Sequence, residues 1–536
     1  MSSETSRASR LEPFPPWHWN VPEFLNIGVV CTDAHLGTPV ESRVAMVVED
    51  DSLGTSSITY GDLARRTSRF AQLLRNLGVA AGDRVLVRLP NSIDYPTAFL
   101  GAMKRGAIAV PTSTLLTGDE VRYLVEDSGV LAIVIDLPAW NAMRGKLEGA
   151  GKLRHIIIAG EAFERALADV GTIEPPHPTR AGDPAYLVYT SGTTGYPKGV
   201  LHAHRSLVGR APASQYWFDF EGEDRIVHSG KFNWTYVLGS ALMDPLARGK
   251  TVIAHEGRND AATWPRLIAK HGATIFIGVP TVYRQILQKT AFTRADVPAL
   301  RHCMSAGEHL SDEVFALWKE RFGLDIYEAV GMSEFSYYLS QSKLRPIRPG
   351  SAGFPQPGHE IRLLDPDTLA EAPRGEEGMI CIPESDPGLF LRYWNLPEET
   401  AKLRHDGWFF TGDYARYDED GYLWFLGRKD DIIKSFGYRV SPYEVERVMK
   451  SHPAVADCAC IAEEAGPDKR LVVAYVIPRP GHPVTPGELL AFGRGKLATY
   501  KAPKIVYMAQ EFPRTRNGKI LRREITPRIA TARSAA

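Results

Sequence analysis

The chain has 536 residues, of which 44% are hydrophobic and 24% charged, with 63 basic and 63 acidic side chains. This composition is typical of a folded globular protein with roughly three to four domain-sized units, and it excludes extensive disorder. A formal net charge of zero provides no overall field for nucleic acid or an anionic membrane. We therefore expect neither as a partner.

The cysteines and the N-terminal residues indicate in which cellular compartment the protein is expected. Five cysteines are too few, and odd in number, for a disulfide framework. Cys458 and Cys460 stand in an apolar run, which predicts buried strand residues rather than metal ligands. The N-terminal residues lack the apolar segment of a signal peptide, and no run of about 18 apolar residues predicts a membrane span. The sequence predicts a cytoplasmic protein.

From residue 60 onward the predicted elements alternate between helix and strand. Apolar residues at helical spacing predict helices over Tyr60–Gly78 and Tyr95–Arg105. Short apolar runs predict a first group of strands at 84–89, 107–111, 131–135 and 155–159, and a second group at 185–189, 250–253, 274–278 and 300–305. This alternation is typical of parallel sheets covered by helices. It predicts two α/β subdomains.

After about residue 345, short alternating runs rich in Gly and Pro predict a small antiparallel β unit. Further on, Ser441-Pro442-Tyr443-Glu444 predicts a capping box that starts the helix Pro442–Lys450. Strands over 455–461 and 471–477 complete a small α+β domain. The predicted organisation is an N-terminal domain of residues 1–428 and a small mobile C-terminal domain of residues 429–536.

The segment Thr190–Val200 (TSGTTGYPKGV) predicts a phosphate-binding loop. Its hydroxyls can donate to phosphate oxygens, its glycines let backbone N–H groups approach an anion, and a lysine adds charge. The expected ligands are Thr190, Ser191, Gly192, Thr193, Thr194, Gly195 and Lys198. The spacing differs from a Walker A loop. A polar surface turn is the alternative, but the particular order of residues favours a phosphate site.

This segment resembles the phosphate loop of the adenylate-forming superfamily, which contains acyl-CoA synthetases, peptide-synthetase adenylation domains and luciferases. Gly331-Met332-Ser333-Glu334 resembles the family's Gly-x-Thr-Glu element. The resemblance implies that Ser333 binds the α-phosphate of ATP and that Glu334 holds Mg²⁺, an ion that takes hard oxygen ligands and shares them with phosphates.

Other segments imply contacts to the nucleoside. Thr411-Gly412-Asp413 resembles the family's ribose-binding element, which implies that Asp413 accepts from the ribose hydroxyls and that Arg428 also touches ribose. Val330 departs from the aromatic residue that many relatives place on adenine. The remaining expected contacts to adenine are Ser305, Ala306, Gly307, Glu308 and Tyr327.

The C-terminal motifs imply two functional states. Residues 427–431 resemble the domain junction, with Asp430 at the hinge, and Gly437-Tyr438-Arg439 resembles the lining of the coenzyme A thiol tunnel. Residues 513–519 resemble the terminal lysine motif, which implies that Lys519 reaches the substrate carboxylate and the α-phosphate. A domain swing would remove Lys519 and bring in Gly437.

Together these residues predict an AMP-forming acid–CoA ligase that uses ATP, Mg²⁺ and coenzyme A. An acid carboxylate that attacks ATP brings two anions together, so Lys198, Lys519 and Mg²⁺ would offset the developing charge. No general base is needed because the acid is already ionised. His202 and His204 are therefore predicted to pack or to hydrogen-bond rather than to bind a metal.

The stretch from Lys231 to Gly239 stands where the family builds its acyl pocket and resembles benzoate–CoA ligases, whereas residues 437–439 resemble medium-chain acyl-CoA synthetases. No acidic residue occurs between Lys231 and Ala241, which argues against an amino acid substrate. An aromatic pocket suits a benzoate-like aromatic or alicyclic acid, with plain core packing as the alternative at each position. The expected pocket residues are Asn233, Trp234, Tyr236, Gly239 and Tyr337.

Several alternatives remain open. The substrate could be a medium-chain or branched fatty acid, and the acceptor could be a carrier protein, although no carrier domain follows residue 536. A non-catalytic nucleotide-binding protein is the alternative from another class, and the full set of motif residues argues against it. A small-molecule carboxylic acid is the expected partner. A lysine acetyltransferase acting on Lys519, whose charge acetylation would remove, and a second copy in a homodimer are further candidates.

Overall fold

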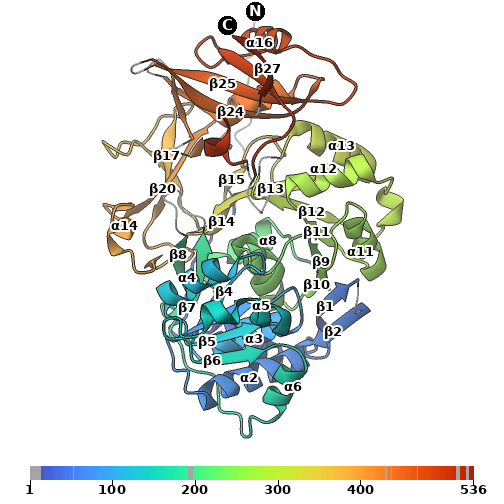
Figure 1. Ribbon diagram of the computed structural model, residues 1–536, viewed down its shortest axis with the longest axis vertical. Coiled ribbons are helices and arrows are strands. Elements are labelled where there is room, and N and C mark those ends of the chain that lie inside the picture. Colours follow the sequence, from blue (N-terminus) through green and yellow to red (C-terminus); the bar gives the residue numbers. More distant parts are fainter. Residues whose placement is uncertain are drawn as a thin grey trace, which may run out of the picture.

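The computed structural model describes residues 14–51, 54–190, 197–308, 310–428, 431–435, 438–466, 469–514, 520–526 and 530–535. The body (residues 14–428) contains two large sheets with helices and a smaller β sheet. The C-terminal unit (residues 431–535) stands on the body at one end of the molecule (Figure 1). The predicted α/β class, with a small antiparallel β unit and a small C-terminal α+β unit, is confirmed.

The first sheet has the strand order β18-β8-β7-β4-β3-β5-β6. Val85 and Val87 of β3 face a core formed with α2, α3 and α6, while Leu86 faces a core formed with α4 and α5. The bounds are β3 (Arg84–Arg88), β4 (Ile108–Pro111), β5 (Ala132–Ile135), β6 (His155–Ile158), β7 (Pro184–Thr190), β8 (Lys198–Ala203), β18 (Arg392–Tyr393), α2 (Tyr60–Asn76), α3 (Asp94–Lys104), α4 (Gly118–Ser128), α5 (Leu137–Leu147) and α6 (Glu161–Ala168).

The second sheet has the order β15-β14-β13-β12-β11-β9-β10-β1-β2. Helices α11, α12 and α13 share a hydrophobic core with one of its faces. The bounds are β1 (Val44–Asp50), β2 (Gly54–Thr59), β9 (Arg225–His228), β10 (Thr251–Glu256), β11 (Ile275–Ile277), β12 (His302–Ala306), β13 (Ile326–Met332), β14 (Ser336–Ser340), β15 (Phe354–Pro355), α11 (Thr263–His271), α12 (Pro280–Lys289) and α13 (Asp312–Phe322).

Two sequence predictions about these sheets are wrong in detail. The strand at 185–189, predicted to begin the second subdomain, pairs with β4 in the first sheet, while β1 and β2 join the second. Both sheets also carry antiparallel strands, such as β8 against β7 and β14 against β13. The connections 191–197 and 333–335 are too short for the crossover of about a dozen residues that a parallel pair requires.

The smaller sheet of the body has the order β16-β17-β20-β19, with β21 beside β20. Its bounds are β16 (Arg362–Leu364), β17 (Gly378–Pro383), β19 (Arg404–His405), β20 (Trp408–Tyr417) and β21 (Leu423–Arg428). The shorter elements of the body are α1 (Ile27–Val30), η1 (Asp33–His35), α7 (Ser206–Gly209), α8 (Ala211–Tyr216), α9 (Thr235–Val237), the π-helix η2 (Leu238–Met243), α10 (Asp244–Ala247), η3 (Arg294–Asp296) and α14 (Pro397–Ala401).

In the C-terminal unit, α15 and α16 pack on a sheet of order β24-β25-β26-β27, and β22 pairs with β23. Ser441 caps α15 as predicted, but both carboxylate oxygens of Glu444 lie 2.8 Å from Lys501 Nζ. Cys458 and Cys460 are buried on β24, as predicted. The bounds are β22 (Ile433–Ser435), β23 (Tyr438–Val440), α15 (Pro442–Lys450), β24 (Val455–Gly466), β25 (Lys469–Pro478), α16 (Pro486–Lys496), β26 (Ile505–Ala509), η4 (Arg522–Glu524) and β27 (Ala530–Ala535).

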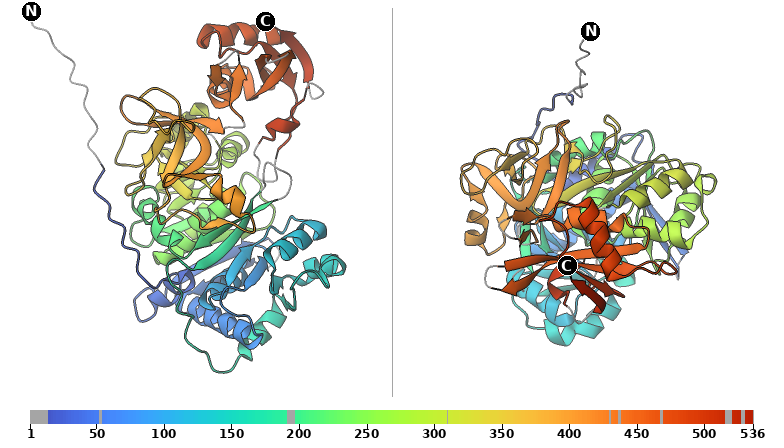
Figure 2. Two further views of the ribbon diagram at one scale, coloured as in Figure 1. Left: turned by 90° about the vertical axis from the view of Figure 1, so that its left-hand side faces the viewer. Right: turned by 90° about the horizontal axis from the view of Figure 1, so that it is seen from above.

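Figure 2 shows the C-terminal unit rising from the body, with the segment that begins at residue 14 running along another side of the body. Trp19 attaches this N-terminal segment to the body, because its indole Nε1 donates a hydrogen bond to the carbonyl of Gly358 at 3.1 Å. Among the described residues, no helix combines the length and apolar character that crossing a membrane requires.

Candidate active site

The predicted phosphate loop connects the antiparallel strands β7 and β8. Thr190 and Lys198 face each other in the pairing register at its two ends. Ser191, Gly192, Thr193, Thr194 and Gly195 lie outside the described residues. The ammonium of Lys198 is 3.0 Å from a carboxylate oxygen of Glu399 and 5.5 Å from the centre of the Tyr393 ring.

Glu334 lies in the turn between β13 and β14 and is 9% exposed. Its Oε1 accepts a 2.7 Å hydrogen bond from the Tyr393 hydroxyl, and its backbone carbonyl accepts from Phe390 N at 2.8 Å. Burial, together with the Glu334 charge, raises the pKa of Tyr393. Tyr393 therefore stays protonated and keeps donating to the carboxylate.

The backbone of Ser333 is hydrogen-bonded to the imidazole of His202. The carbonyl of Ser333 lies 2.7 Å from His202 Nε2, and the imidazole stacks on Tyr186 with ring centres 4.7 Å apart. Burial lowers the pKa of His202 to about 3, so the ring is neutral and Nε2 carries the donated proton. His204 is also buried, and its Nδ1 accepts from Ile27 N at 3.1 Å. Both histidines thus pack and hydrogen-bond, as predicted.

Asp413 and Arg428 form the third part of the site. They are paired residues on β20 and β21, with Arg428 Nε 3.3 Å from Asp413 Oδ1. Asp413 is 5% exposed, and its backbone N–H donates to the Thr411 hydroxyl. The Asp413 charge, and to a smaller extent that of Glu334, raises the pKa of Arg428. The predicted ribose and magnesium residues therefore share one electrostatic environment.

The residues expected around adenine lie at the end of β12, just after it, and on the neighbouring strand β13. Ser305 and Ala306 are buried and face Glu328 and Ala329 of β13, while Gly307 adopts a positive φ of 90°. A Glu308 carboxylate oxygen accepts from the Thr281 hydroxyl at 2.8 Å. Tyr327 stacks on His302, with ring centres 4.7 Å apart.

The residues expected in the acyl pocket form an aromatic cluster next to Gly307. Tyr236 and Tyr337 both pack against Trp217, at ring-centre distances of 6.3 and 4.9 Å. Gly239, in the π-helix η2, packs closely on Tyr337, since a Cβ there would lie 2.9 Å from the Tyr337 hydroxyl. Trp234 lies between Tyr236 and Gly307, and the neighbouring Asn233 is partly exposed.

The residues expected from the C-terminal unit are only partly described. The backbones of Tyr438 and Arg439 form β23, while Asp430, Gly437 and Lys519 lie outside the described residues. The described residues that flank the lysine segment are anchored within the unit. Arg514 pairs with Asp457 at 2.6 Å, and Arg522 pairs with Glu446 at 2.8 Å and lies over the Tyr443 ring.

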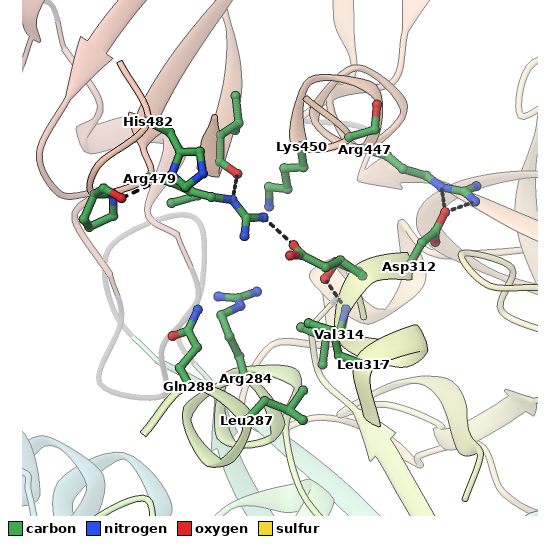
Figure 3. Close-up of a pocket in the computed structure, with 16 residues that line it drawn as sticks. Arg284, Leu287, Gln288, Asp312, Val314, Leu317, Arg447, Lys450, Arg479 and His482 are labelled. Carbon is green, nitrogen blue, oxygen red and sulfur yellow. Dashed lines mark hydrogen bonds and ion pairs between the residues drawn. The ribbon is translucent and has the colours of Figure 1, made fainter. Parts of the chain in front are cut away.

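A cleft of about 450 Å³ separates the C-terminal unit from α12 and α13. Ion pairs cross this cleft, from Arg479 to Glu313 at 2.5 Å and from Arg447 to Asp312 at 2.7 Å. Figure 3 shows Arg447 and Asp312 facing each other across it. Arg284 of α12 also points into the cleft (Figure 3). In the described part of the chain, these charged contacts hold the unit against the body.

Sequence reasoning missed the segment 390–400. Its Tyr393 binds Glu334, and its Glu399 binds Lys198. The segment is fixed by the pairing of β18 with β8 and by Trp394 N, which donates to Gly199 O at 2.7 Å. It contains no glycine-rich loop, and its adjacent acidic residues Glu398 and Glu399 fit the first turn of an ordinary helix, so the sequence alone provided no signal for a role at the site.

Comparison with known proteins bears directly on this site. Residues 38–394 match the AMP-binding enzyme family, and residues 444–519 match the AMP-binding enzyme C-terminal domain. The chain belongs to the AMP-binding enzyme family. It is 34% identical to the benzoate–CoA ligase of Thauera aromatica, over 87% of this chain and 90% of that protein.

Two further relatives extend the comparison. The mitochondrial acyl-coenzyme A synthetase ACSM3 of Mus musculus is 31% identical, over 87% of this chain and 83% of that protein. The crystal structure of ATP-bound MatB from Rhodopseudomonas palustris superposes with a TM-score of 0.85 at 28% identity, covering 93% of this chain and 97% of that one. The predicted superfamily and the predicted enzyme class, an AMP-forming acid–thiol ligase, are confirmed.

Proposed function

We propose that this AMP-binding enzyme activates a benzoate-like aromatic or alicyclic acid with ATP and transfers the acyl group to coenzyme A. The observation that carries this proposal is the convergence of Lys198, Glu334 and Asp413 from three different sheets, with Tyr393 linking the first two. A lysine, a carboxylate for a metal and a carboxylate for ribose are the groups that an ATP-dependent adenylation requires.

Magnesium fits the residues present. Glu334 offers a nearly buried carboxylate whose Oε1 is oriented by Tyr393. Ser333, its neighbour, adds a hydroxyl. Mg²⁺ commonly takes one or two protein carboxylates and completes its shell with water and phosphate oxygens. When bound, Mg²⁺ neutralises phosphate charge.

The chain's own residues then handle the first half-reaction. The acid carboxylate needs no base because it is ionised at neutral pH. Lys198 at the phosphate loop and Lys519 from the C-terminal unit lower the repulsion between this carboxylate and the α-phosphate. Asp413 and Arg428 hold the ribose, and the residues 305–308 with Tyr327 bind adenine.

The second half-reaction requires the C-terminal unit to move. We place the domain boundary at residues 428–429 and the hinge at Asp430, with residues 437–439 lining the thiol tunnel after the swing. The contacts across the cleft support this, because side-chain ion pairs such as Arg447–Asp312 can break without unfolding either unit.

The aromatic cluster supports a ring-shaped acid. Tyr236 and Tyr337 pack on the buried Trp217 where the acyl pocket is expected, and the relative from Thauera aromatica is a benzoate–CoA ligase. The similarity to an acyl-coenzyme A synthetase supports a medium-chain or branched fatty acid as a second candidate substrate. Loading of a carrier protein is the remaining alternative.

The deciding experiment is a panel of acids in a pyrophosphate-release assay with ATP, Mg²⁺ and coenzyme A. We expect benzoate, substituted benzoates and cyclohexane carboxylate to exceed hexanoate and octanoate in kcat/KM. Mass spectrometry of the thioester product distinguishes coenzyme A from a carrier protein as the acceptor. Preference for octanoate would reject the aromatic assignment, and acid-independent ATP hydrolysis alone would reject the acid-activation role.

Three further proposals concern regulation, location and assembly. Acetylation of Lys519 would remove its charge and stop adenylate formation. Activity that persists after complete modification of Lys519 would contradict this proposal.

A cytoplasmic location and a homodimer are also proposed. Fractionation of cells checks the first, and light scattering of the full chain checks the second, with a mass near 59.3 kDa ruling out the dimer.

A further inference from the structure

The carboxylate of Glu399 forms an ion pair with the ammonium group of Lys198, the lysine at the end of the predicted phosphate loop. Glu399 Oε2 lies 3.0 Å from Lys198 Nζ, and its other oxygen lies 2.7 Å from Lys402 Nζ. The side chains of Lys198 and Glu399 are 21% and 35% exposed. This is a partly shielded contact at the position where the triphosphate of a nucleotide is expected.

The contact is built into the fold. Tyr393 pairs with Val200, two residues beyond Lys198, and Tyr393 N donates to the Thr400 hydroxyl at 3.0 Å. Pro397 begins α14, whose short helix carries Glu399 toward β8. Because Tyr393 pairs with the strand that carries Lys198 and Thr400 is bonded to Tyr393, Glu399 meets the lysine in a defined geometry.

We propose that Glu399 is an internal anion that holds Lys198 in the nucleotide-free enzyme, is displaced by the phosphates of ATP, and thereby sets nucleotide affinity. The inference rests on the proposed function, since it takes Lys198 as a ligand of ATP. A carboxylate and a phosphate are both oxyanions that form charge-assisted hydrogen bonds with one ammonium. Bound ATP must therefore break the ion pair and also approach a negative side chain.

The hydrogen bond from Lys402, and then that from Lys198, lowers the pKa of Glu399 to about 2. Glu399 is therefore ionised throughout the neutral range, and the competition does not depend on pH there. Lys402 shares the same carboxylate and stays beside it when Lys198 leaves. Glu399 thus acts through Lys198 as a positioning residue and takes no part in bond making.

The test is the equilibrium affinity of the full-length protein for MgATP, measured by calorimetry without acid or coenzyme A. Glu399→Gln removes the charge and keeps the shape. Because partly exposed ion pairs contribute modestly, we expect about two- to fivefold tighter binding. Glu398→Gln is the matched control, because it removes the same charge from the same helix. Glu398 is the preceding residue and is exposed. This control variant should leave the affinity unchanged.

Steady-state kinetics separates this role from a structural one. Glu399→Gln should lower the KM for ATP by a similar factor while kcat changes by less than about twofold, because chemistry begins after Lys198 has been released. Weaker ATP binding by Glu399→Gln, or an equal effect of Glu398→Gln, would overturn the inference. Failure of the wild-type protein to bind MgATP would instead remove the proposed function itself.

Discussion

The hydroxyl of Tyr393 donates a 2.7 Å hydrogen bond to Oε1 of Glu334, although the two residues are 59 positions apart in the chain. The donor is buried and the acceptor is charged, so the bond fixes the carboxylate in one orientation. Tyr393 also faces Lys198 through its ring. One side chain therefore sets the relative position of the metal-binding and phosphate-binding groups of the proposed site.

Tyr393→Phe should weaken magnesium-dependent activation. Loss of a hydrogen-bonding partner behind a metal-binding carboxylate typically reduces metal affinity by about 10- to 100-fold. We expect the Mg²⁺ concentration for half-maximal ATP–pyrophosphate exchange to rise about tenfold. Tyr422→Phe, which removes a buried hydroxyl that donates to Pro346 O, is the control and should leave the Mg²⁺ dependence unchanged. An unchanged dependence in Tyr393→Phe would contradict the positioning role.

Asp413→Asn should weaken ATP binding by about tenfold or more. The substitution removes the negative charge that pairs with Arg428 and that we propose accepts from ribose, and hydrogen bonds to charged groups contribute about 1.5–3 kcal/mol. Calorimetry with MgATP measures the effect. Asp406→Asn, in an exposed turn, should bind ATP like the wild type. Equal affinities for both variants would remove Asp413 from the nucleotide site.

Breaking the ion pairs across the cleft should affect the two half-reactions differently. Asp312→Asn and Arg447→Gln each remove the pair between the body and the C-terminal unit, which is worth a factor of about two to five. Adenylate formation should slow by that factor, while thioester formation from supplied acyl-AMP should not slow.

The double variant Asp312→Asn with Arg447→Gln should resemble Arg447→Gln alone, because that single variant already removes the ion pair, together with the hydrogen bond from Arg447 to Pro349 O. Lys319→Gln, which breaks a pair with Asp325 within the body, serves as the control. Parallel losses in both half-reactions would indicate that the cleft contacts do not favour the adenylating orientation.

Gly239→Ala should change acid selectivity and leave ATP handling intact. The added methyl group would lie 2.9 Å from the Tyr337 hydroxyl, so the tyrosine must shift within the aromatic cluster. We expect kcat/KM for substituted benzoates to fall about tenfold with no change in the KM for ATP. Gly145→Ala in α5, where a Cβ meets no neighbour within 4 Å, is the matched control. A rise in the KM for ATP would place Gly239 outside the acyl pocket.

Stability should fall in mild acid because of buried neutral histidines. Burial lowers the pKa of His202 and His228 to about 3, and that of His204 and His302 to about 4. The unfolded chain takes up these protons near pH 6.5, whereas the folded chain does not. This stability is therefore complete above pH 6.5 and is lost as pH falls toward 4.

Urea unfolding at several values between pH 7.5 and 5 measures that slope. His204→Asn keeps an acceptor for Ile27 N but removes one titrating group. The dependence of unfolding free energy on pH should decrease by up to about one proton. A slope equal to that of the wild type would show that His204 titrates alike in both states.

Local patterns account for what the sequence predicted well. The helix expected over Tyr60–Gly78 is found at Tyr60–Asn76, because the Thr59 cap and the apolar spacing both act within one or two turns. The capping box at Ser441 is only half formed, because Glu444 binds Lys501, which is 57 residues later in the chain. The Glu444 carboxylate therefore pairs with a distant lysine and does not close the capping box.

The relationships that the sequence could not predict depend on which strands become neighbours. The motif residues at 333–334 and 411–413 were identifiable one by one, but the role of Tyr393 follows from the pairing of β18 with β8. The same pairing brings Glu399 to Lys198. No periodicity or local propensity encodes such a contact between remote segments.

Lys198 and its ion-pair partner Glu399 are separated by 201 positions along the chain. At about 5–20 residues per second, a ribosome needs on the order of ten to forty seconds to synthesise the chain between them. The β7–β8 hairpin must therefore wait, during translation, without the strand and the carboxylate that later complete it. The early sheets therefore have to persist on their own hydrophobic cores during this interval.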